Sequence, residues 1–195
     1  MSPLAGRGMQ FDYPAIDGVT ADLLLVTHEH LDHNGVEVIG GDPKILRSTA
    51  GKHESPVGEV VGVASEHDQV AGTERGPNTI FVFSLDGLRV AHFGDFGQTA
   101  LRDEQAAAIG EVDLIFLPVG GGPTVDAAQA REIVDRLSPK WVVPMHYRTE
   151  KIGFLDPADG FIEEFGEVHR CEEPSFETGD LPVAEHPVVV VPAVP

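Results

Sequence analysis

The residues best suited to chemistry lie in a short hexad near the N-terminal end of the sequence. Three imidazoles and a carboxylate fall close together, at His28, His30, Asp32 and His33. Imidazole and carboxylate groups suit borderline divalent metals such as Zn²⁺, Mn²⁺ or Fe²⁺. A catalytic ion in a tetrahedral site keeps one position open, so four potential ligands exceed what one ion needs. The hexad therefore predicts two ions that share a site.

Other candidate ligands follow apolar runs elsewhere, which favours a metal site over a histidine-rich surface turn. The hexad follows the apolar run 23–26, and later runs end close to His67, Asp95 and His146. Each run has the length and composition of a buried strand. Sites in sheet proteins commonly gather on the loops that follow strand ends. We therefore expect these three residues and the hexad to form one site.

These ligands require an alternation of strands and helices to position them. We predict strands over 21–26, 44–48, 59–65, 79–85, 88–93, 112–117 and 141–145, and helices over 101–109, 126–137 and 158–165. Asp86-Gly87 is typical of a hairpin turn, Thr124 or Asp126 could cap the second helix, and the run 188–191 is expected to add an edge strand. Neither a repeat nor a linker interrupts the pattern. The sequence therefore predicts one α/β domain over residues 1–195.

The ordered set of motifs resembles the metallo-β-lactamase superfamily of metal-dependent hydrolases, from Ala21 to Tyr147. The H-x-H-x-D-H signature matches the hexad, and His92-Phe93-Gly94-Asp95 and Pro144-Met145-His146-Tyr147 are similar to a small branch related to ascorbate-6-phosphate lactonases. The resemblance implies a mixed α/β (α+β) αββα four-layer sandwich, in which two facing sheets carry helices outside. Relatives begin with a strand pair, whereas Met1–Gly18 show little alternation here. The sequence leaves open whether this pair is absent or the reading frame starts late.

The resemblance also implies a role for each ligand. His28, His30 and His67 would hold metal one, Asp32, His33 and His146 would hold metal two, and Asp95 would bridge them. Zn²⁺ is the first expectation for both ions, with Mn²⁺ or Fe²⁺ as alternatives. Asp32 and Asp95 would be catalytic, in a binuclear hydrolase whose metal-bridging hydroxide attacks a small ester or lactone. Two alternatives stay open: a small-molecule phosphodiesterase, and a metal-stabilised binding protein without catalysis.

Three further polar residues are candidates for contact with a small-molecule substrate. Asn78 could bind an oxyanion or phosphate, or it could hold a loop together. Tyr147 could donate to a developing oxyanion, although a packing role fits its position equally well. Arg148 follows directly, and its place next to His146 puts it near the site.

Composition limits the partners and the location. The net charge of −19, from 32 acidic and 13 basic residues, repels polyanions and counts against nucleic acid. Secretion and membrane insertion are not expected, because the sequence shows neither a signal pattern nor an apolar run of about 18 residues. The single cysteine, Cys171, is compatible with a reducing compartment, so we expect a cytoplasmic protein. If the N-terminal strand pair is missing, the edge of the sheet at Ala21 would be buried in a homo-oligomer, or covered by residues 1–18 or 188–191.

Overall fold

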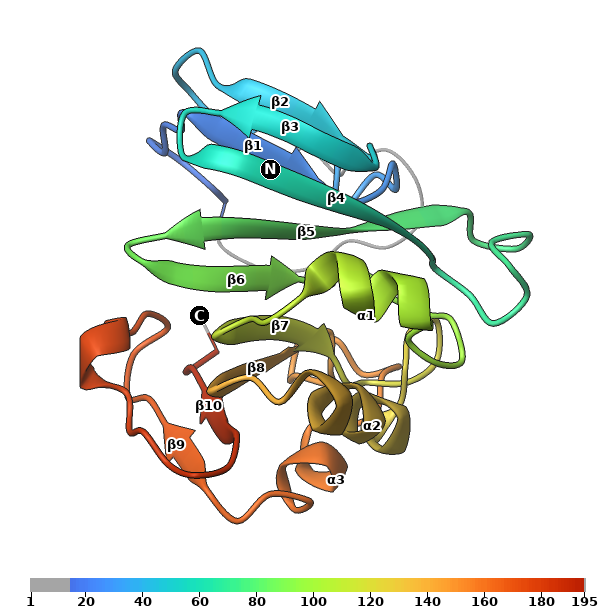
Figure 1. Ribbon diagram of the computed structural model, residues 1–195, viewed down its shortest axis with the longest axis vertical. Helices are drawn as coiled ribbons and strands as arrows, with labels where there is room; N and C mark the ends of the chain where they lie inside the picture. Colours follow the sequence, from blue (N-terminus) through green and yellow to red (C-terminus); the bar gives the residue numbers. More distant parts are fainter. Residues whose placement is uncertain (1–14, 195) are drawn as a thin grey trace.

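The computed structural model describes residues 15–194, and its strands form two sheets (Figure 1). The small sheet pairs β1 (Leu23–Val26) with β2 (Lys44–Arg47) in parallel. The large sheet has eight strands in the order β3-β4-β5-β6-β7-β8-β10-β9. These strands are β3 (Gly51–Ser55), β4 (Gly58–Glu66), β5 (Pro77–Leu85), β6 (Leu88–His92), β7 (Leu114–Pro118), β8 (Trp141–Met145), β9 (Val168–Arg170) and β10 (Val188–Val191).

Three α-helices pack on one face of the large sheet. They are α1 (Asp103–Ile109), α2 (Ala127–Leu137) and α3 (Asp159–Ile162), and short 3-10 helices span Val36–Val38 and Thr178–Asp180. Strand alternation separates the two faces: Ile80 and Val82 of β5 join the helices in the main core, whereas Phe81 packs with residues of the small sheet on the other face. Among the described residues, no helix combines the length and the apolar character needed to cross a bilayer.

This arrangement confirms the predicted α/β class and its metallo-β-lactamase type of fold, while three strands differ from expectation. β3 and β9 were not predicted. Gly51–Ser55 is polar and becomes a strand by hairpin pairing with β4, and β9 has only three residues. The run 188–191 does not form an edge strand. It lies between β8 and β9 as β10, with Val189 facing the helices and Val188 facing the opposite core. It therefore cannot cover the edge of β1.

The topology brings several strand ends to one edge of the sheet. β4 and β6 are both antiparallel to β5, and β7 and β8 follow β6 in parallel. The carboxyl ends of β4, β6 and β8 therefore lie on the same edge, where β5 begins. The small sheet is tied to this edge, because the backbone N–H of Thr79 donates to the Thr27 carbonyl at 2.9 Å.

Candidate metal centre

The centre is built around the carboxylate of Asp95, which follows β6. Its Oδ2 atom lies 3.8 Å from Nε2 of His28, 3.4 Å from that of His33, 3.2 Å from that of His67 and 3.5 Å from that of His146. His28 and His33 come from the loop after β1, His67 from the end of β4, and His146 from the end of β8. Three strand ends thus direct four imidazole nitrogens at one oxygen atom.

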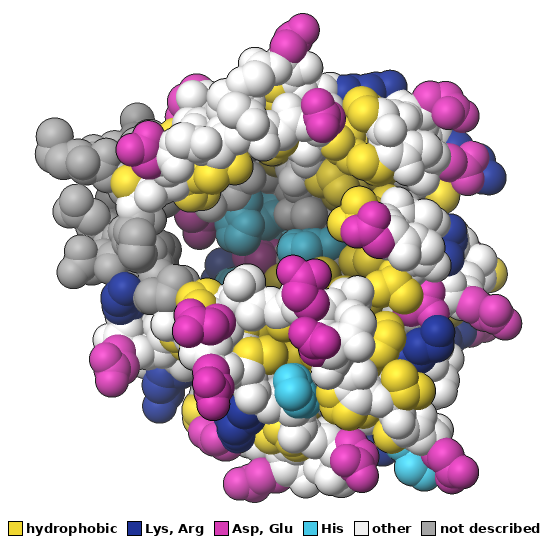
Figure 2. All heavy atoms as spheres, turned by 90° about the vertical axis from the view of Figure 1, so that its left-hand side faces the viewer, with side chains coloured by type: hydrophobic (Ala, Val, Ile, Leu, Met, Phe, Trp, Pro, Cys, Tyr) yellow, Lys and Arg dark blue, Asp and Glu magenta, His cyan; other side chains and the backbone are white. Residues whose placement is uncertain are grey.

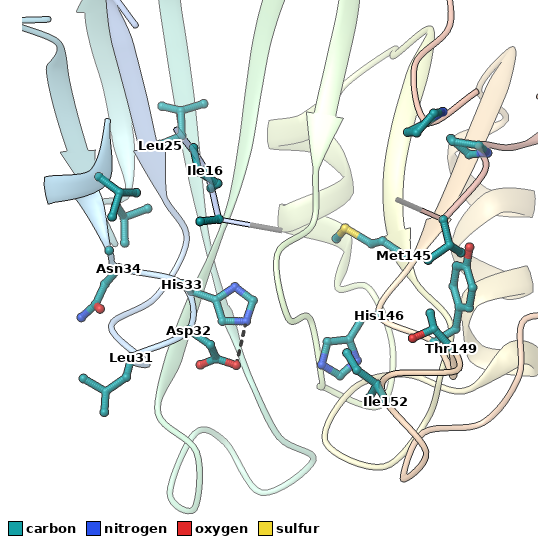
Figure 3. A pocket seen from close by; sticks show the side chains of 18 of the residues that line it. Ile16, Leu25, Leu31, Asp32, His33, Asn34, Met145, His146, Thr149 and Ile152 are labelled. Carbon is teal, nitrogen blue, oxygen red and sulfur yellow. Dashed lines mark ion pairs between the residues drawn. The ribbon is translucent and has the colours of Figure 1, made fainter. Parts of the chain in front are cut away.

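The other two residues of the hexad complete the cluster. The ring centroid of His30 lies 4.7 Å from that of His28 and 4.9 Å from that of His67. Asp32 Oδ2 lies 3.6 Å from Nε2 of His33, and Figure 3 shows this pair facing His146. Ligand atoms of His28, His30 and His67 all lie within 4.8 Å of one another, as do those of His28, His33 and Asp95. The structure therefore brings together all seven residues that the sequence singled out.

Neighbouring groups fix the orientation of the imidazoles. His67 Nδ1 donates to the Pro123 carbonyl at 3.2 Å, so its proton is on Nδ1 and its Nε2 lone pair faces Asp95. Thr124 Oγ1 lies 3.4 Å from His146 Nδ1 in the same loop. Contacts of this kind on the far ring nitrogen are typical of histidines that ligate metals. These partners could not be predicted from the sequence, because Pro123 and Thr124 lie 56 and 22 residues from the histidines that they contact.

Burial lowers the pKa of two of the imidazoles and leaves one buried ring nitrogen without a partner among the described residues. Desolvation lowers the pKa of His28 to about 3, helped by the nearby His33, and it also lowers the pKa of His146. His28 Nδ1 contacts Thr27 Oγ1 at 3.0 Å, whereas its buried Nε2 has no hydrogen-bond partner among the described residues. An unsatisfied buried polar atom costs about 1–3 kcal/mol. A cation at this nitrogen would offset that cost.

The carboxylate at the middle of the cluster is ionised. Burial alone would raise its pKa, but the neighbouring His67, whose Nε2 lies 3.2 Å from Asp95 Oδ2, and the fields of His33 and His146 hold the pKa of Asp95 below its usual range. The Asp95 oxygen and the four ring nitrogens around it are all electron-pair donors, and such groups repel one another unless a cation lies between them. The donor set therefore fits divalent metal ions.

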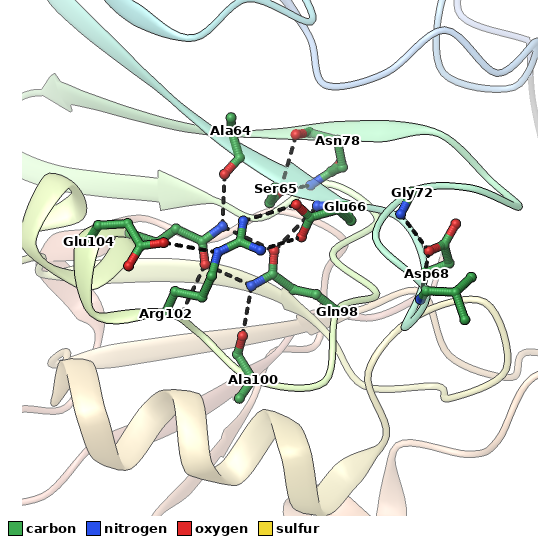
Figure 4. Close-up of polar contacts among 12 residues, drawn as sticks. Ala64, Ser65, Glu66, Asp68, Gly72, Asn78, Gln98, Ala100, Arg102 and Glu104 are labelled. Carbon is green, nitrogen blue, oxygen red and sulfur yellow. Dashed lines mark hydrogen bonds and ion pairs between the residues drawn. The ribbon is translucent and has the colours of Figure 1, made fainter.

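Asn78 fixes the position of the Asp95 backbone. Its Oδ1 accepts from the backbone N–H of Asp95 at 3.1 Å, and its Nδ2 donates to the Phe93 carbonyl at 2.8 Å. The same Nδ2 donates to Ser65 Oγ at 2.8 Å (Figure 4). Asn78 is only 1% exposed. Its amide is thus bonded within the protein, which differs from the substrate contact expected from the sequence and supports a positioning role.

The turn at Gly94 requires a residue without a side chain. Gly94 has φ +57°, in the left-handed region that favours glycine. A Cβ there would lie 2.4 Å from Asn78 Oδ1 and 2.7 Å from Thr27 Cβ. The close approach lets the loop after β6 pass between β1 and β5, and so it sets the position of Asp95.

Two polar networks flank His67 along the chain. On one side, the Glu66 carboxylate pairs with Arg102 at 2.9 Å, and the backbone N–H of Glu66 donates to Gln98 Oε1 at 3.3 Å (Figure 4). On the other side, the Asp68 carboxylate accepts four backbone N–H groups of the loop that follows. Burial alone would raise the pKa of Asp68, but these four bonds lower it. The end of β4 is therefore fixed on both sides of His67.

An open cavity of about 1000 Å³ adjoins the cluster, with Asp32, His33 and His146 at one end (Figure 3). The space-filling view shows histidine side chains inside this hollow (Figure 2). Tyr147 lines the cavity. Arg148 lies elsewhere, because its Nε donates to the Leu155 carbonyl at 2.6 Å and holds the loop after β8. Of the three expected substrate contacts, Tyr147 is the one that reaches the cavity wall.

Comparison with known proteins identifies related sequences. A beta-lactamase superfamily domain model matches residues 3–146. A UPF0173 metal-dependent hydrolase of Thermococcus kodakarensis is 31% identical over 162 residues, which cover 67% of this chain and 69% of that protein. A UPF0173 protein of Pyrococcus abyssi is 33% identical over 178 residues, which cover 78% of this chain and 79% of that protein.

Solved structures show the same relationship. A Thermotoga maritima protein, described as a candidate Zn-dependent hydrolase of the metallo-β-lactamase superfamily, is 32% identical with a TM-score of 0.74. The match covers 92% of this chain and 86% of that one. A candidate metal-dependent hydrolase of Parabacteroides distasonis is 25% identical with a TM-score of 0.57, over 75% of this chain and 74% of that one. This chain therefore belongs to the metallo-β-lactamase superfamily of metal-dependent hydrolases.

Proposed function

We propose that residues 1–195 act as one binuclear hydrolase domain that cleaves a small ester or lactone. His28, His30 and His67 would hold one divalent ion, Asp32, His33 and His146 the second, and Asp95 would bridge them. The observation that carries this proposal is the single Asp95 oxygen that faces four imidazole nitrogens within 3.8 Å. One tetrahedral ion with an open position needs only three of these seven side chains.

The chemistry needs positive charge next to an open cavity. Two divalent ions, Zn²⁺ first and Mn²⁺ or Fe²⁺ as alternatives, would acidify a bound water and polarise the substrate carbonyl. Asp32 and Asp95 contribute two negative charges that offset part of the charge of the ions. Asn78 and the Gly94 turn position Asp95, and Pro123 keeps the Nε2 lone pair of His67 directed at the centre.

The cavity supports a small molecule that reaches the centre from one side. Asp32 is the more accessible carboxylate, with its side chain 48% exposed, whereas the Asp95 side chain is 7% exposed. Tyr147 follows His146 on the cavity wall, where we assign it the contact with the carbonyl oxygen of the substrate. An open cavity at a cluster of this kind supports an enzyme over a binding protein that has lost catalysis.

The test is a substrate screen with the metal-replete full chain. We expect hydrolysis of lactones or simple esters, dependent on added Zn²⁺ or Mn²⁺ and lost after chelation. Cleavage of small phosphodiesters with esters left intact would move the assignment to a phosphodiesterase. Tight metal binding without turnover of any of these classes would instead support a non-catalytic metal protein.

A further inference from the structure

The walls of the cavity beside the metal centre are mostly aliphatic and aromatic. In Figure 3, Ile16 and Leu25 lie on the side of the small sheet, whereas Met145 and Ile152 lie on the side of β8. None of the described residues that line the cavity is Lys or Arg. The charged side chains of the wall, apart from histidine, are the acidic Asp32 and Glu37. A ligand chain in this cavity would therefore meet apolar carbon and negative charge.

Several wall residues expose large apolar side chains around the same opening. Ile16 is 58% exposed, Leu31 58% and Phe154 56%, and all three line this cavity. Single exposed apolar residues are ordinary, but a contiguous patch at a concave site marks the binding of an apolar group. The patch stands out here because the chain as a whole carries a net charge of −19.

The wall chemistry also argues against a phosphorylated or otherwise anionic ligand. Sites for phosphate groups supply Arg, Lys or converging backbone N–H groups. The described wall offers carboxylates at Asp32 and Glu37 instead. A remote anionic group would lose its hydration there without gaining a cationic partner.

From this we propose that the cavity binds the apolar acyl or alkyl chain of an uncharged ester or lactone. The proposal rests on the function proposed above and specifies its substrate class. The cavity volume of about 1000 Å³ is at the upper end of the usual range for small-molecule sites. The cavity therefore has room for a chain of medium length. In the reaction, water adds to the carbonyl carbon and the bond from that carbon to the ester oxygen breaks. A proton passes to the departing alkoxide, and the products are a carboxylate, a released proton and an alcohol, joined in one molecule when the substrate is a lactone.

The experiment is a chain-length series of 4-nitrophenyl esters, from acetate to decanoate, below the concentrations at which they form micelles. With the Zn²⁺-loaded full chain we expect kcat/KM to rise about two- to fourfold for each added methylene until the cavity is filled. Ile152→Ser and Phe154→Ser should each flatten this rise while leaving acetate hydrolysis and metal content unchanged. Leu85→Ser is the matched control, because Leu85 is 50% exposed at the β5–β6 hairpin and does not line the cavity.

The outcomes separate this inference from the proposed function. Acetate hydrolysis with no dependence on chain length would overturn the inference and leave the hydrolase assignment in place. If no ester is hydrolysed, the proposed function fails, and calorimetry with decanoate then tests the cavity directly. Binding that Phe154→Ser weakens and Leu85→Ser does not would support an apolar-chain site, and absence of binding would overturn it. If Phe154→Ser instead abolishes self-association and leaves the chain-length series unchanged, the cavity is an interface between copies and the inference is wrong.

Discussion

At the scale of single residues, the site combines many electron-pair donor atoms with few formal charges. Asp95 supplies one buried negative charge, and the four facing imidazoles supply none when they are neutral. Protonation of all four would place several positive charges within a few ångströms of one another, which the low dielectric of the interior disfavours. Divalent ions satisfy the same lone pairs with less mutual repulsion. The cluster is therefore more complementary to metal ions than to protons.

Asp95→Asn tests the bridging role of this carboxylate. The amide keeps the shape but removes the charge, so we expect activity to fall by roughly 100-fold or more in the metal-replete protein. The sheets keep their own core, so Tm should change by less than about 4 °C. Asp22→Asn, at an exposed position before β1, is the control and should change neither quantity. Full activity in Asp95→Asn with both ions bound would show that Asp95 does not bridge.

The metal-free protein should lose stability in mild acid because of His28. Its pKa is about 3 in the folded chain and 6.5 when unperturbed. Between these values the unfolded chain takes up a proton that the folded chain refuses, so the free energy of unfolding falls as pH decreases from 6.5 towards 3. Urea midpoints of the chelated protein between pH 7 and 4, in high salt to screen surface charge, would show this decline. His28→Gln should reduce the dependence of the urea midpoint on pH. An unchanged pH dependence in this variant would assign the effect to other groups.

At the scale of elements, the cores on the two faces of the large sheet hold the site-bearing strand ends in place. Alternation along β5 to β8 sends one set of side chains to the helices and the other to the opposite face. The helix α2 begins next to the loop 120–125, which carries Pro123 and Thr124. Its N-cap Asp126 accepts from the backbone N–H of Gln129 at 2.9 Å.

Asp126→Ala should therefore destabilise the fold without altering the chemistry. Loss of a helix N-cap costs about 1 kcal/mol, which lowers Tm by roughly 2–4 °C in a domain of this size. Asp126→Asn is the matched control, because asparagine caps about as well as aspartate. Thermal unfolding of both variants checks this. Equal decreases of Tm in Asp126→Ala and Asp126→Asn would show that the charge of Asp126, rather than the cap, stabilises the helix.

The elements that the sequence predicted are those with strong apolar periodicity. The strands at 59–65, 79–85, 88–93 and 141–145 were placed within two residues of their observed ends, because each has a buried face. β3 was missed, since Gly51–Ser55 has no apolar face and pairing with β4 alone makes it a strand. β10 was found but misplaced, because an all-valine run shows burial and does not show which strands flank it.

The candidate site was predictable from the sequence to a similar extent as the fold. Residue types at strand ends were enough to single out the seven clustered residues, because the topology of the sheet brings those ends together. The residues that orient them were not predictable. Thr27, Pro123 and Thr124 carry no distinctive chemistry, and the latter two lie 56 and 22 residues from the histidines that they contact. Asn78 was noticed, but its burial beneath Asp95 depends on tertiary packing.

At the scale of the whole molecule, a strongly acidic chain presents several strand edges that are unpaired within the described residues, and the edge of β1 is one of them. Within residues 15–194, β1 pairs with β2 on one side, and no described strand pairs with its other side. Unpaired edges are templates for pairing with another chain. The net charge of −19 opposes such contact by long-range repulsion, which salt screens.

We therefore expect self-association that increases with ionic strength. Light scattering of the full chain from low salt to about 1 M, where the screening length is roughly 3 Å, should show a shift from monomer towards dimer or a higher oligomer. Leu23→Lys, on the edge of β1, should reduce this shift, as charged side chains do on natural edge strands. Leu85→Lys, which adds the same charge at the exposed β5–β6 hairpin away from β1, is the matched control. A monomer at every salt concentration would contradict the prediction.

The central claim is that the cluster around Asp95 holds two divalent ions. Titration of the chelated protein with Zn²⁺, followed by calorimetry and elemental analysis after removal of free metal, tests it most directly. The geometry predicts two ions per chain at saturation, with the second bound more weakly in Asp95→Asn because that ion relies on the shared carboxylate. Saturation at a single ion per chain, with no further uptake at higher Zn²⁺, would contradict the binuclear centre and the mechanism built on it.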